Sequence, residues 1–209
     1  MEIFFGIVMA LTSIVGLTFI IERGLALRWN KIIPPSVEDA AEACRSAADR
    51  TLLRRVCEQN PSPLARLLLT AEQHLSMTME ENENALQTRA RQEIVRLERG
   101  LVILEIVVGI APLLGLVGTI YGMMALFGGL GQSGLTDNTI LAHGISLILR
   151  FTMMGLLIAI PSLIAWSYYT KKVEMLAVEM ETVCEEFIRR QYHLGRQAPA
   201  PELTATAKK

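Results

Sequence analysis

The sequence predicts an all-α membrane protein with three transmembrane helices and long helical extensions in water. Half of the 209 residues are apolar (51%), only 20% are charged, and the mean hydropathy is +0.36. The apolar residues are concentrated in three long blocks. Basic residues follow the first block, precede the second and follow the third, and none lies between the second and the third. A net charge of −1 and three cysteines argue against a nucleic-acid binder and a disulfide-rich secreted scaffold.

The first block, residues 3–21, carries no charge and lies within a first expected span over residues 1–22. About 20 helical residues cross a hydrocarbon core of ~30 Å, so its length suits a span. The alternative is a cleaved signal peptide. We expect a retained anchor, because Glu2 stands where a signal peptide has basic residues and no small-residue cleavage site precedes Glu22 and Arg23.

The second and third blocks give expected spans over residues 101–130 and 144–169. Each contains one charge, Glu105 in the second and Arg150 in the third. Both are long enough to cross a bilayer, and neither shows the polar stripe of a surface helix in a soluble protein.

Basic residues predict the orientation of these spans. They follow the first block, precede the second and follow the third, whereas residues 131–143 contain no Lys or Arg. The positive-inside rule therefore predicts an outer N-terminus, inner segments over 23–100 and 170–209, and an outer loop over 131–143.

The inner segments are expected to be helical. Residues 23–100 carry 12 basic and 11 acidic residues, typical of solvated helix faces. We predict a helix from a cap at Ser36 to about Glu58, and another from Met79 to Arg99 that continues into the second span. The third span is expected to extend over 170–195, with a possible apolar face of Met175, Val178, Val183 and Phe187, before a disordered tail over 196–209.

Enzyme motifs are absent from the sequence. It contains no phosphate loop, no nucleophile elbow and no zinc-protease motif. Cys44, Cys57 and Cys184 are not spaced as zinc ligands, and the histidines His74, His143 and His193 are isolated. The sequence therefore indicates neither an enzyme, nor a metal site, nor a cofactor.

The second span carries three glycines on one helical face, Gly115, Gly118 and Gly122. A small-residue face lets helix backbones approach closely, so a plain packing groove explains these glycines by themselves. Thr119 adjoins this face, and Thr152 lies in the third span at a matched depth of roughly 12 Å below the outer surface. Two such hydroxyls on adjacent antiparallel helices are candidates to line a polar passage, although a lone threonine usually bonds its own helix.

The two lone charges are functional candidates, since charges within membranes usually face a bundle interior or a cavity. Glu105 lies either in the inner headgroup region or at the inner exit of an ion path. Arg150 either snorkels outward or pairs with a carboxylate such as Asp137 or one from another chain. It is turned about 160° from Thr152, so the two are not expected to line the same passage. Pro161 interrupts the hydrogen-bond ladder of the third span.

The sequence resembles the MotA/TolQ/ExbB proton-channel family, in its TolQ/ExbB branch. The matching stretches are IERGLAL (residues 21–27), APLLGLVGTIYGMMALF (111–127) and LAHGISLILRFTMMGLLIAIPSLIAWSYY (141–169), in the same order and topology, over essentially residues 1–190. The resemblance implies a multi-pass protein of the bacterial inner membrane with a periplasmic N-terminus and cytoplasmic helical extensions.

The resemblance also implies partners and an activity. Family members assemble as homopentamers around two copies of a single-span ExbD- or TolR-like partner, whose aspartate takes and releases protons. Proton flow drives that partner, which serves a TonB-like or Tol-type system. Thr119 and Thr152 correspond to pore-lining threonines and Pro161 to the family's third-span proline. The translocated ion is expected to be a proton, and threonine-lined sites also serve sodium.

One departure separates this sequence from the branch. Leu147 stands where these proteins usually carry a glutamate, and Arg150 stands in a stretch that is usually apolar. Replacing an acid by leucine removes a proton-binding site, and a nearby arginine disfavours cations. The resemblance makes a proton-channel subunit the main hypothesis. The departures at Leu147 and Arg150 keep open the alternative, a non-conducting scaffold that holds a partner helix. An unrelated permease would show more spans or an internal repeat.

Overall fold

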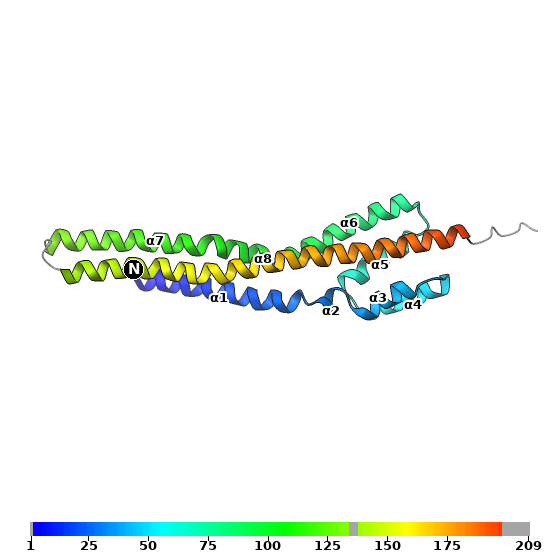
Figure 1. Cartoon of the computed structure of the whole chain (residues 1–209), viewed down its shortest axis with the longest axis horizontal. Helices are drawn as coiled ribbons and strands as arrows, with labels where there is room; N and C mark the ends of the chain where they lie inside the picture. Colours follow the sequence, from blue (N-terminus) through cyan, green and yellow to red (C-terminus); the bar gives the residue numbers. More distant parts are fainter. Residues whose placement is uncertain (1, 134–137, 198–209) are drawn as a thin grey trace, which may run out of the picture. The chain divides into compact units, whose positions relative to one another are not determined.

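The computed structural model describes residues 2–133 and 138–197, and every regular element in this part of the chain is an α-helix (Figure 1). The helices form two compact units. The apolar unit comprises Met1–Leu27 and Leu97–Val173, and the polar unit comprises Arg28–Arg96 and Glu174–Lys209. The predicted all-α class is confirmed.

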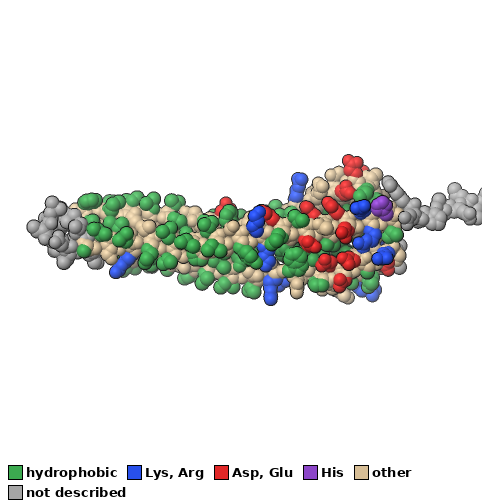
Figure 2. Space-filling view, in the orientation of Figure 1, with side chains coloured by type: hydrophobic (Ala, Val, Ile, Leu, Met, Phe, Trp, Pro, Cys, Tyr) green, Lys and Arg blue, Asp and Glu red, His purple; other side chains and the backbone are tan. Residues whose placement is uncertain are grey.

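The apolar unit contains α1 (Glu2–Ala26), α7 (Leu101–Ser133) and the first part of α8 (Asn138–Gln197). Three segments in these helices are long and apolar enough to cross a membrane, Ile3–Ala26, Leu101–Gly128 and Gly144–Leu194. Large apolar side chains point outward, and Ile3, Met124 and Ile164 are 79%, 69% and 65% exposed. Hydrophobic side chains cover the visible face over these helices (Figure 2). Such a surface is stable in lipid rather than in water.

The helices α7 and α8 are longer at the ends that face residues 131–143 than predicted. α7 continues to Ser133 and α8 begins at Asn138, so helix replaces most of the loop expected over 131–143. Residues 134–137, which include Asp137, lie outside the described part, as do residues 198–209 of the tail expected to be disordered.

The polar unit contains five helices and the second part of α8. The five are α2 (Trp29–Ile32), α3 (Pro35–Ala43), α4 (Ala47–Gln59), α5 (Pro63–Gln73) and α6 (Met79–Glu98). The helix predicted from Ser36 to Glu58 is wrong, because two helices occupy this range. Ser46 and Asp49 form a capping box that starts α4, with Ser46 Oγ accepting from the Asp49 amide at 3.3 Å. Pro34, not Ser36, occupies the N-cap of α3.

The predicted continuous helix from Met79 into the second span is also wrong. A turn at Arg99 and Gly100 separates α6 from α7. The Arg23 guanidinium lies where a side chain on residue 100 would be, and its Nη1 donates to the Leu97 carbonyl at 3.2 Å. Arg23 therefore packs over the turn at Gly100, and its flexible side chain would have to move if residue 100 carried a side chain.

The α8 extension is confirmed, but its buried face differs from the prediction. Met175 and Val178 are exposed, Val183 is half-buried and only Phe187 is buried. The buried positions of α8 in the polar unit instead repeat every three or four residues: Leu176, Met180, Cys184, Phe187, Ile188 and Gln191.

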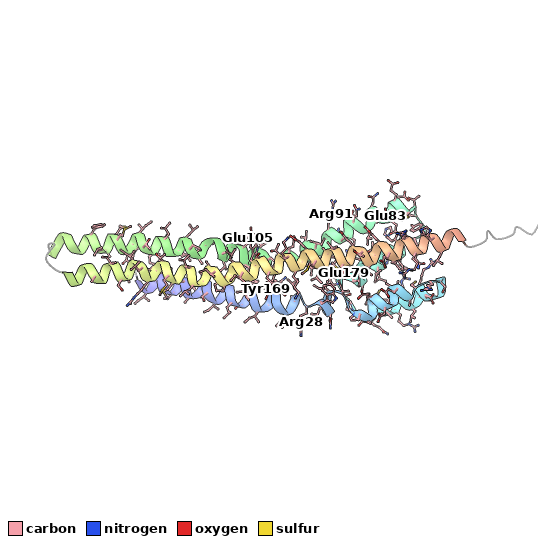
Figure 3. The ribbon with its side chains drawn as sticks, in the orientation of Figure 1. Arg28, Glu83, Arg91, Glu105, Tyr169 and Glu179 are labelled. Atoms are coloured by element: carbon pink, nitrogen blue, oxygen red, sulfur yellow. The ribbon has the colours of Figure 1, made fainter. Side chains whose placement is uncertain are left out.

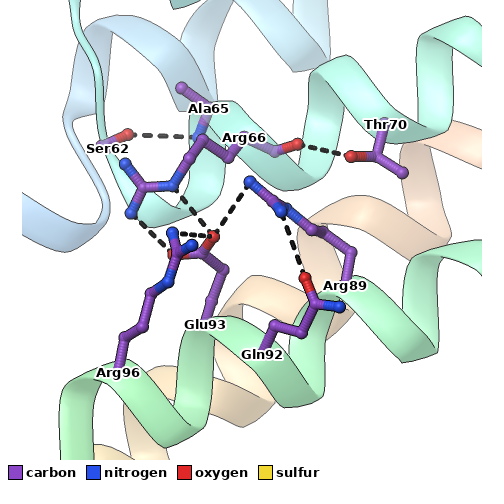
Figure 4. Close-up of polar contacts among 8 residues, drawn as sticks. All are labelled: Ser62, Ala65, Arg66, Thr70, Arg89, Gln92, Glu93 and Arg96. Carbon is purple, nitrogen blue, oxygen red and sulfur yellow. Dashed lines mark hydrogen bonds and ion pairs between the residues drawn. The ribbon is translucent and has the colours of Figure 1, made fainter.

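A buried carboxylate joins α5 to α6 in the polar unit (Figure 4). The Glu93 side chain is 1% exposed, and Arg66 donates to its two oxygens at 3.0 and 2.6 Å. Arg89 and Arg96 of α6 add ion pairs at 3.3 and 3.2 Å. A buried charge is tolerated only when it is paired and hydrogen-bonded, and Glu93 meets that condition.

Candidate functional site

The contact between α7 and α8 in the apolar unit is a backbone contact made by glycines. A methyl group on Gly155 of α8 would lie 2.7 Å from the Ala111 carbonyl oxygen and 3.2 Å from the Cα of Gly115. A methyl group on Gly115 would lie 3.1 Å from the Phe151 carbonyl oxygen. The contact leaves no room for a side chain at Gly155 and only tight room at Gly115, so the backbones approach as in small-residue helix pairs.

The same contact continues toward the end of α7 and the start of α8. Gly118 faces the Phe151 ring, Gly122 faces Ile148, and Leu126 faces Gly144. In each of these pairs the two residue numbers sum to 269 or 270, which defines an antiparallel register. Gly115, Gly118 and Gly122 therefore all lie in the α7–α8 interface.

This register brings Thr119 and Thr152 to the same level. Thr119 lies opposite residues 150 and 151, about one residue rise (~1.5 Å) from Thr152. The Thr119 hydroxyl donates to the Leu116 carbonyl at 2.6 Å, and the Thr152 hydroxyl donates to the Ile148 carbonyl at 3.4 Å, a long bond. Each hydroxyl therefore bonds its own helix and keeps lone pairs with which to accept another proton donor.

Both threonines also lie on the same side of the helix pair. Each directly follows an interface residue, Gly118 on α7 and Phe151 on α8. Each successive residue is rotated by about 100° around the helix axis. Because the two helices run in opposite directions, this rotation places Thr119 and Thr152 on the same side of the pair. Tyr121, which contacts α1 through Phe5 with ring centroids 5.6 Å apart, is turned about 160° from Thr119. We call the threonine side, which faces away from α1, the open side of the α7–α8 pair; Thr152 is exposed there.

Two further α7 residues fall on the open side. Glu105, Pro112 and Thr119 are spaced seven residues apart, so they form a stripe that drifts by only about 40° over two heptads. Glu105 is exposed near the start of α7 (Figure 3), about 21 Å along the axis from Thr119. Pro112 has no N–H to donate, so the Val108 carbonyl lacks its usual helical donor. The predictions missed Pro112, although its heptad spacing from Glu105 and Thr119 was visible.

Arg150 does not belong to this stripe. It is exposed on α8, and among the described residues no ion pair to it is present. It borders an apolar groove on the surface of the apolar unit with Ala142, Ile145, Ser146, Leu149 and Met153. Leu147 lies three residues before it, on the same side of α8.

Pro161 is exposed and does not end α8, which continues as one helix to Gln197. The adjacent Ser162 is 2% exposed, its Oγ donates to the Ile158 carbonyl at 2.8 Å, and a methyl group on Gly16 of α1 would lie 3.2 Å from that Oγ. Ser162 is thus a packing residue between α1 and α8, which the predictions also missed.

The stretch after the first span fixes α1 to the other helices of the apolar unit. The Tyr169 hydroxyl donates to the Ile20 carbonyl at 2.9 Å, and Gly24 leaves room for that hydroxyl (Figure 3). The Arg23 side chain donates to the Leu97 carbonyl. Arg23 and Gly24, both in the IERGLAL stretch, therefore have packing roles.

Groups that suit metal or thiol chemistry are not assembled in the part of the chain that the structure describes. Within it no three His, Cys, Asp or Glu side chains gather as metal ligands. The three cysteines are buried and unpaired, and burial raises the pKa of the Cys57 thiol to about 11 and that of Cys44 above its ordinary value. The side chain of His143 lies outside the described residues, and His74 Nδ1 bonds the Thr70 carbonyl at 2.7 Å.

Three long apolar helices around a glycine-mediated α7–α8 contact define a helical membrane protein. The family model described as the MotA/TolQ/ExbB proton channel family matches residues 59–182, more than half of the chain. This protein therefore belongs to the MotA/TolQ/ExbB proton-channel family.

Curated relatives agree with the TolQ/ExbB branch. The chain is 40% identical over 81 residues to "Biopolymer transport protein ExbB" of Helicobacter pylori, which covers 39% of this chain and 56% of that relative. It is 28% identical over 198 residues to "Tol-Pal system protein TolQ" of Pseudomonas aeruginosa, covering 87% of this chain and 84% of that relative. A Synechocystis relative, "Putative biopolymer transport protein ExbB-like 1", is 27% identical over 97% of this chain and 83% of its own length.

Proposed function

We propose that this protein is a proton-channel subunit of an inner-membrane complex. The complex uses the proton motive force to drive a single-span ExbD- or TolR-like partner and so energises envelope transport or integrity. The carrying observation is the pair of hydroxyls, Thr119 and Thr152, level with each other on the open side of two closely packed apolar helices. Hydroxyls both donate and accept, so they relay protons or hydrate them without a permanent charge.

Glu105 is proposed to mark the inner end of this path. It is exposed, lies on the same α7 stripe as Thr119 and is the lone acid of its apolar segment. An intramembrane carboxylate is costly unless it serves a pathway or reaches the headgroups. The translocated ion is then a proton, and the protein uses neither a cofactor nor enzymatic chemistry.

The proposed assembly is a homopentamer around two partner helices in the inner membrane, with the N-terminus in the periplasm. The arrangement of basic residues supports this orientation. The uncovered open side and the exposed apolar residues of α7 support burial against other helices. Native mass spectrometry of the complex is expected to give five copies of this chain, and a monomer or dimer would contradict the proposal.

The second candidate function is a non-conducting scaffold of the same fold, and two residues favour it. Leu147 supplies no proton-binding group where the branch usually has an acid, and Arg150 places a fixed positive charge nearby. A cation near a narrow path opposes proton passage through Coulomb repulsion.

Reconstitution in liposomes separates the two functions. The chain is reconstituted with its single-span partner, a pH gradient is imposed, and an entrapped dye reports internal pH. A channel acidifies the lumen only when the partner is present. Stable co-purification with no proton flux above protein-free liposomes would contradict the channel and establish the scaffold.

A further inference from the structure

A pocket in the polar unit has no place in the proposed ion path. It has a volume of about 380 Å³ and lies where α4, the turn between α5 and α6, and the end of α8 meet. This volume falls within the usual range of small-molecule sites, ~300–1,000 Å³. The lining residues used below are Arg50, Leu75, Met79, Arg189, Tyr192 and His193.

The polar lining of this pocket is basic. Arg50, Arg189 and His193 line it, and none of its described lining residues is acidic. Among the described residues neither arginine has an ion pair within 4.0 Å, although Arg54 and Arg190, close to them in sequence, pair with Glu72 and Glu186. The two permanent charges beside this small space repel each other, and a bound anion relieves that repulsion.

Arg50 supplies a second and independent observation. Its Nε is shielded from solvent and has no hydrogen-bond partner. Buried polar groups nearly always have partners, because an unmade bond leaves the desolvation cost uncompensated. The Arg50 guanidinium thus lies partly buried at the pocket without an ion-pair partner among the described residues, and an anion in the pocket would supply one.

The pocket is also preorganised. The Tyr192 hydroxyl donates to the Met77 carbonyl at 2.8 Å, and Gln191 Nε2 donates to the Cys44 carbonyl at 2.9 Å. Arg190 donates to the carbonyls of Ala41 and Glu42, at 3.3 and 2.5 Å, at the end of α3. These bonds fix the last turns of α8, and with them the backbone that carries Arg189 and His193, before any ligand arrives.

We propose that this pocket binds a small phosphate-bearing anion with an apolar or aromatic part. The planar arginine fork matches phosphate oxygens in a bidentate way, and two arginines with an imidazole supply enough donors for one phosphate group. Leu75, Met79 and the Tyr192 ring form the apolar wall against which the rest of the ligand packs. An adjacent groove shares Arg189 and Met79 but is bordered by Glu83, Glu181 and Glu185, so the anion is confined to the basic side.

Calorimetric titration tests this proposal on the full chain in zwitterionic nanodiscs, with phenyl phosphate and inorganic phosphate as the probes. We expect saturable binding that is tighter for phenyl phosphate and weakens with added salt. Arg50→Gln and Arg189→Gln are each expected to weaken binding about tenfold or more, since a hydrogen bond between charged groups is lost. Arg55→Gln is the control, because Arg55 is exposed on α4 and does not line the pocket.

Nanodiscs that contain phosphatidylglycerol distinguish the source of the phosphate. Weaker apparent binding of phenyl phosphate there identifies a lipid headgroup as the competing ligand, and unchanged binding identifies a soluble one. Absence of saturable binding would overturn the proposal. So would wild-type affinity in Arg189→Gln, an exposed position whose substitution does not disturb the core. None of these outcomes depends on proton flux.

Discussion

Two kinds of small residue determine what α7 and α8 can do. Gly115 and Gly155 bring the backbones into contact, and Thr119 and Thr152 follow interface residues and so fall on one side of the pair. The position of the hydroxyls thus depends on the glycines. A side chain at Gly155 would separate the helices and move both threonines out of register.

Gly155→Ala is therefore expected to destabilise the apolar unit by about 1–3 kcal/mol, because the new methyl group would meet the Ala111 carbonyl at 2.7 Å. Gly109→Ala is the matched control, since nothing lies within 4 Å of its added methyl group. Alanine there is expected to be neutral or to stabilise the helix by up to ~1 kcal/mol. Thermal unfolding in detergent measures both, and equal stability of the two variants would refute the backbone contact.

Glu38 of α3 gives a pH-dependent prediction in the polar unit. Burial raises the pKa of its carboxyl above the ordinary 4.5, and the nearby Glu179, Glu42 and Asp39 raise it further. The folded chain therefore holds this proton more tightly than the unfolded chain, and its contribution to stability improves as pH falls through the folded-state pKa. Glu38→Gln should raise the melting temperature at pH 7, and the difference should vanish below about pH 4.5. A pH-independent difference would contradict this cause.

Among the elements, α5 and α6 are joined by the buried Glu93, which pairs with Arg66, and by Asn82, which donates to the Ala71 carbonyl at 3.0 Å. Glu93→Ala leaves Arg66 without its bidentate partner, and because the three arginines left behind are partly exposed the expected loss is about 1–3 kcal/mol, less than for a fully buried pair. Urea unfolding monitored by circular dichroism measures this loss. Glu98→Ala, an exposed position on the same helix, is expected to change stability by less than ~0.5 kcal/mol. Similar values for the two variants would show that the cluster contributes little.

The elements show what could be predicted from the sequence and what could not. The three apolar helices and the α8 extension follow from block length and hydropathy, which need no tertiary information. The break at Gly100 was not predictable, because a single glycine within a helical pattern is tolerated and does not by itself end a helix. The break before α4 was predictable, because Ser46 and Asp49 already have the spacing of a capping box.

The candidate site also has features that could be predicted from the sequence and features that could not. The shared face of the three glycines and the matched level of Thr119 and Thr152 along their helices follow from sequence spacing alone. That the threonines share the open side required the register, which Gly118 with Phe151 and Gly122 with Ile148 define. The heptad of Glu105, Pro112 and Thr119 is visible in the sequence, where Pro112 both belongs to the APLLGLVG stretch and interrupts the hydrogen-bond ladder.

At the scale of the whole molecule, the apolar unit carries the proposed ion path and the polar unit carries its own buried core and the basic pocket. The open side of α7 and α8 is uncovered in one chain, so a complete path requires neighbouring chains or the partner helix. Leu147 and Arg150 distinguish this chain from what its branch usually has, and they lie on one side of α8. In the proposed channel, conduction would therefore rely on the two hydroxyls, on Glu105 and on a carboxylate from the partner.

Proton flux through Thr152→Val tests this claim most directly. The variant keeps the shape of the side chain and removes the hydroxyl, and it is reconstituted in liposomes with the single-span partner. We predict that flux falls about tenfold or more, the size expected from losing one hydrogen-bonding group in the path. Thr182→Val, which removes an exposed hydroxyl of α8 in the polar unit, should leave flux unchanged. Wild-type flux in Thr152→Val would contradict the proposed path.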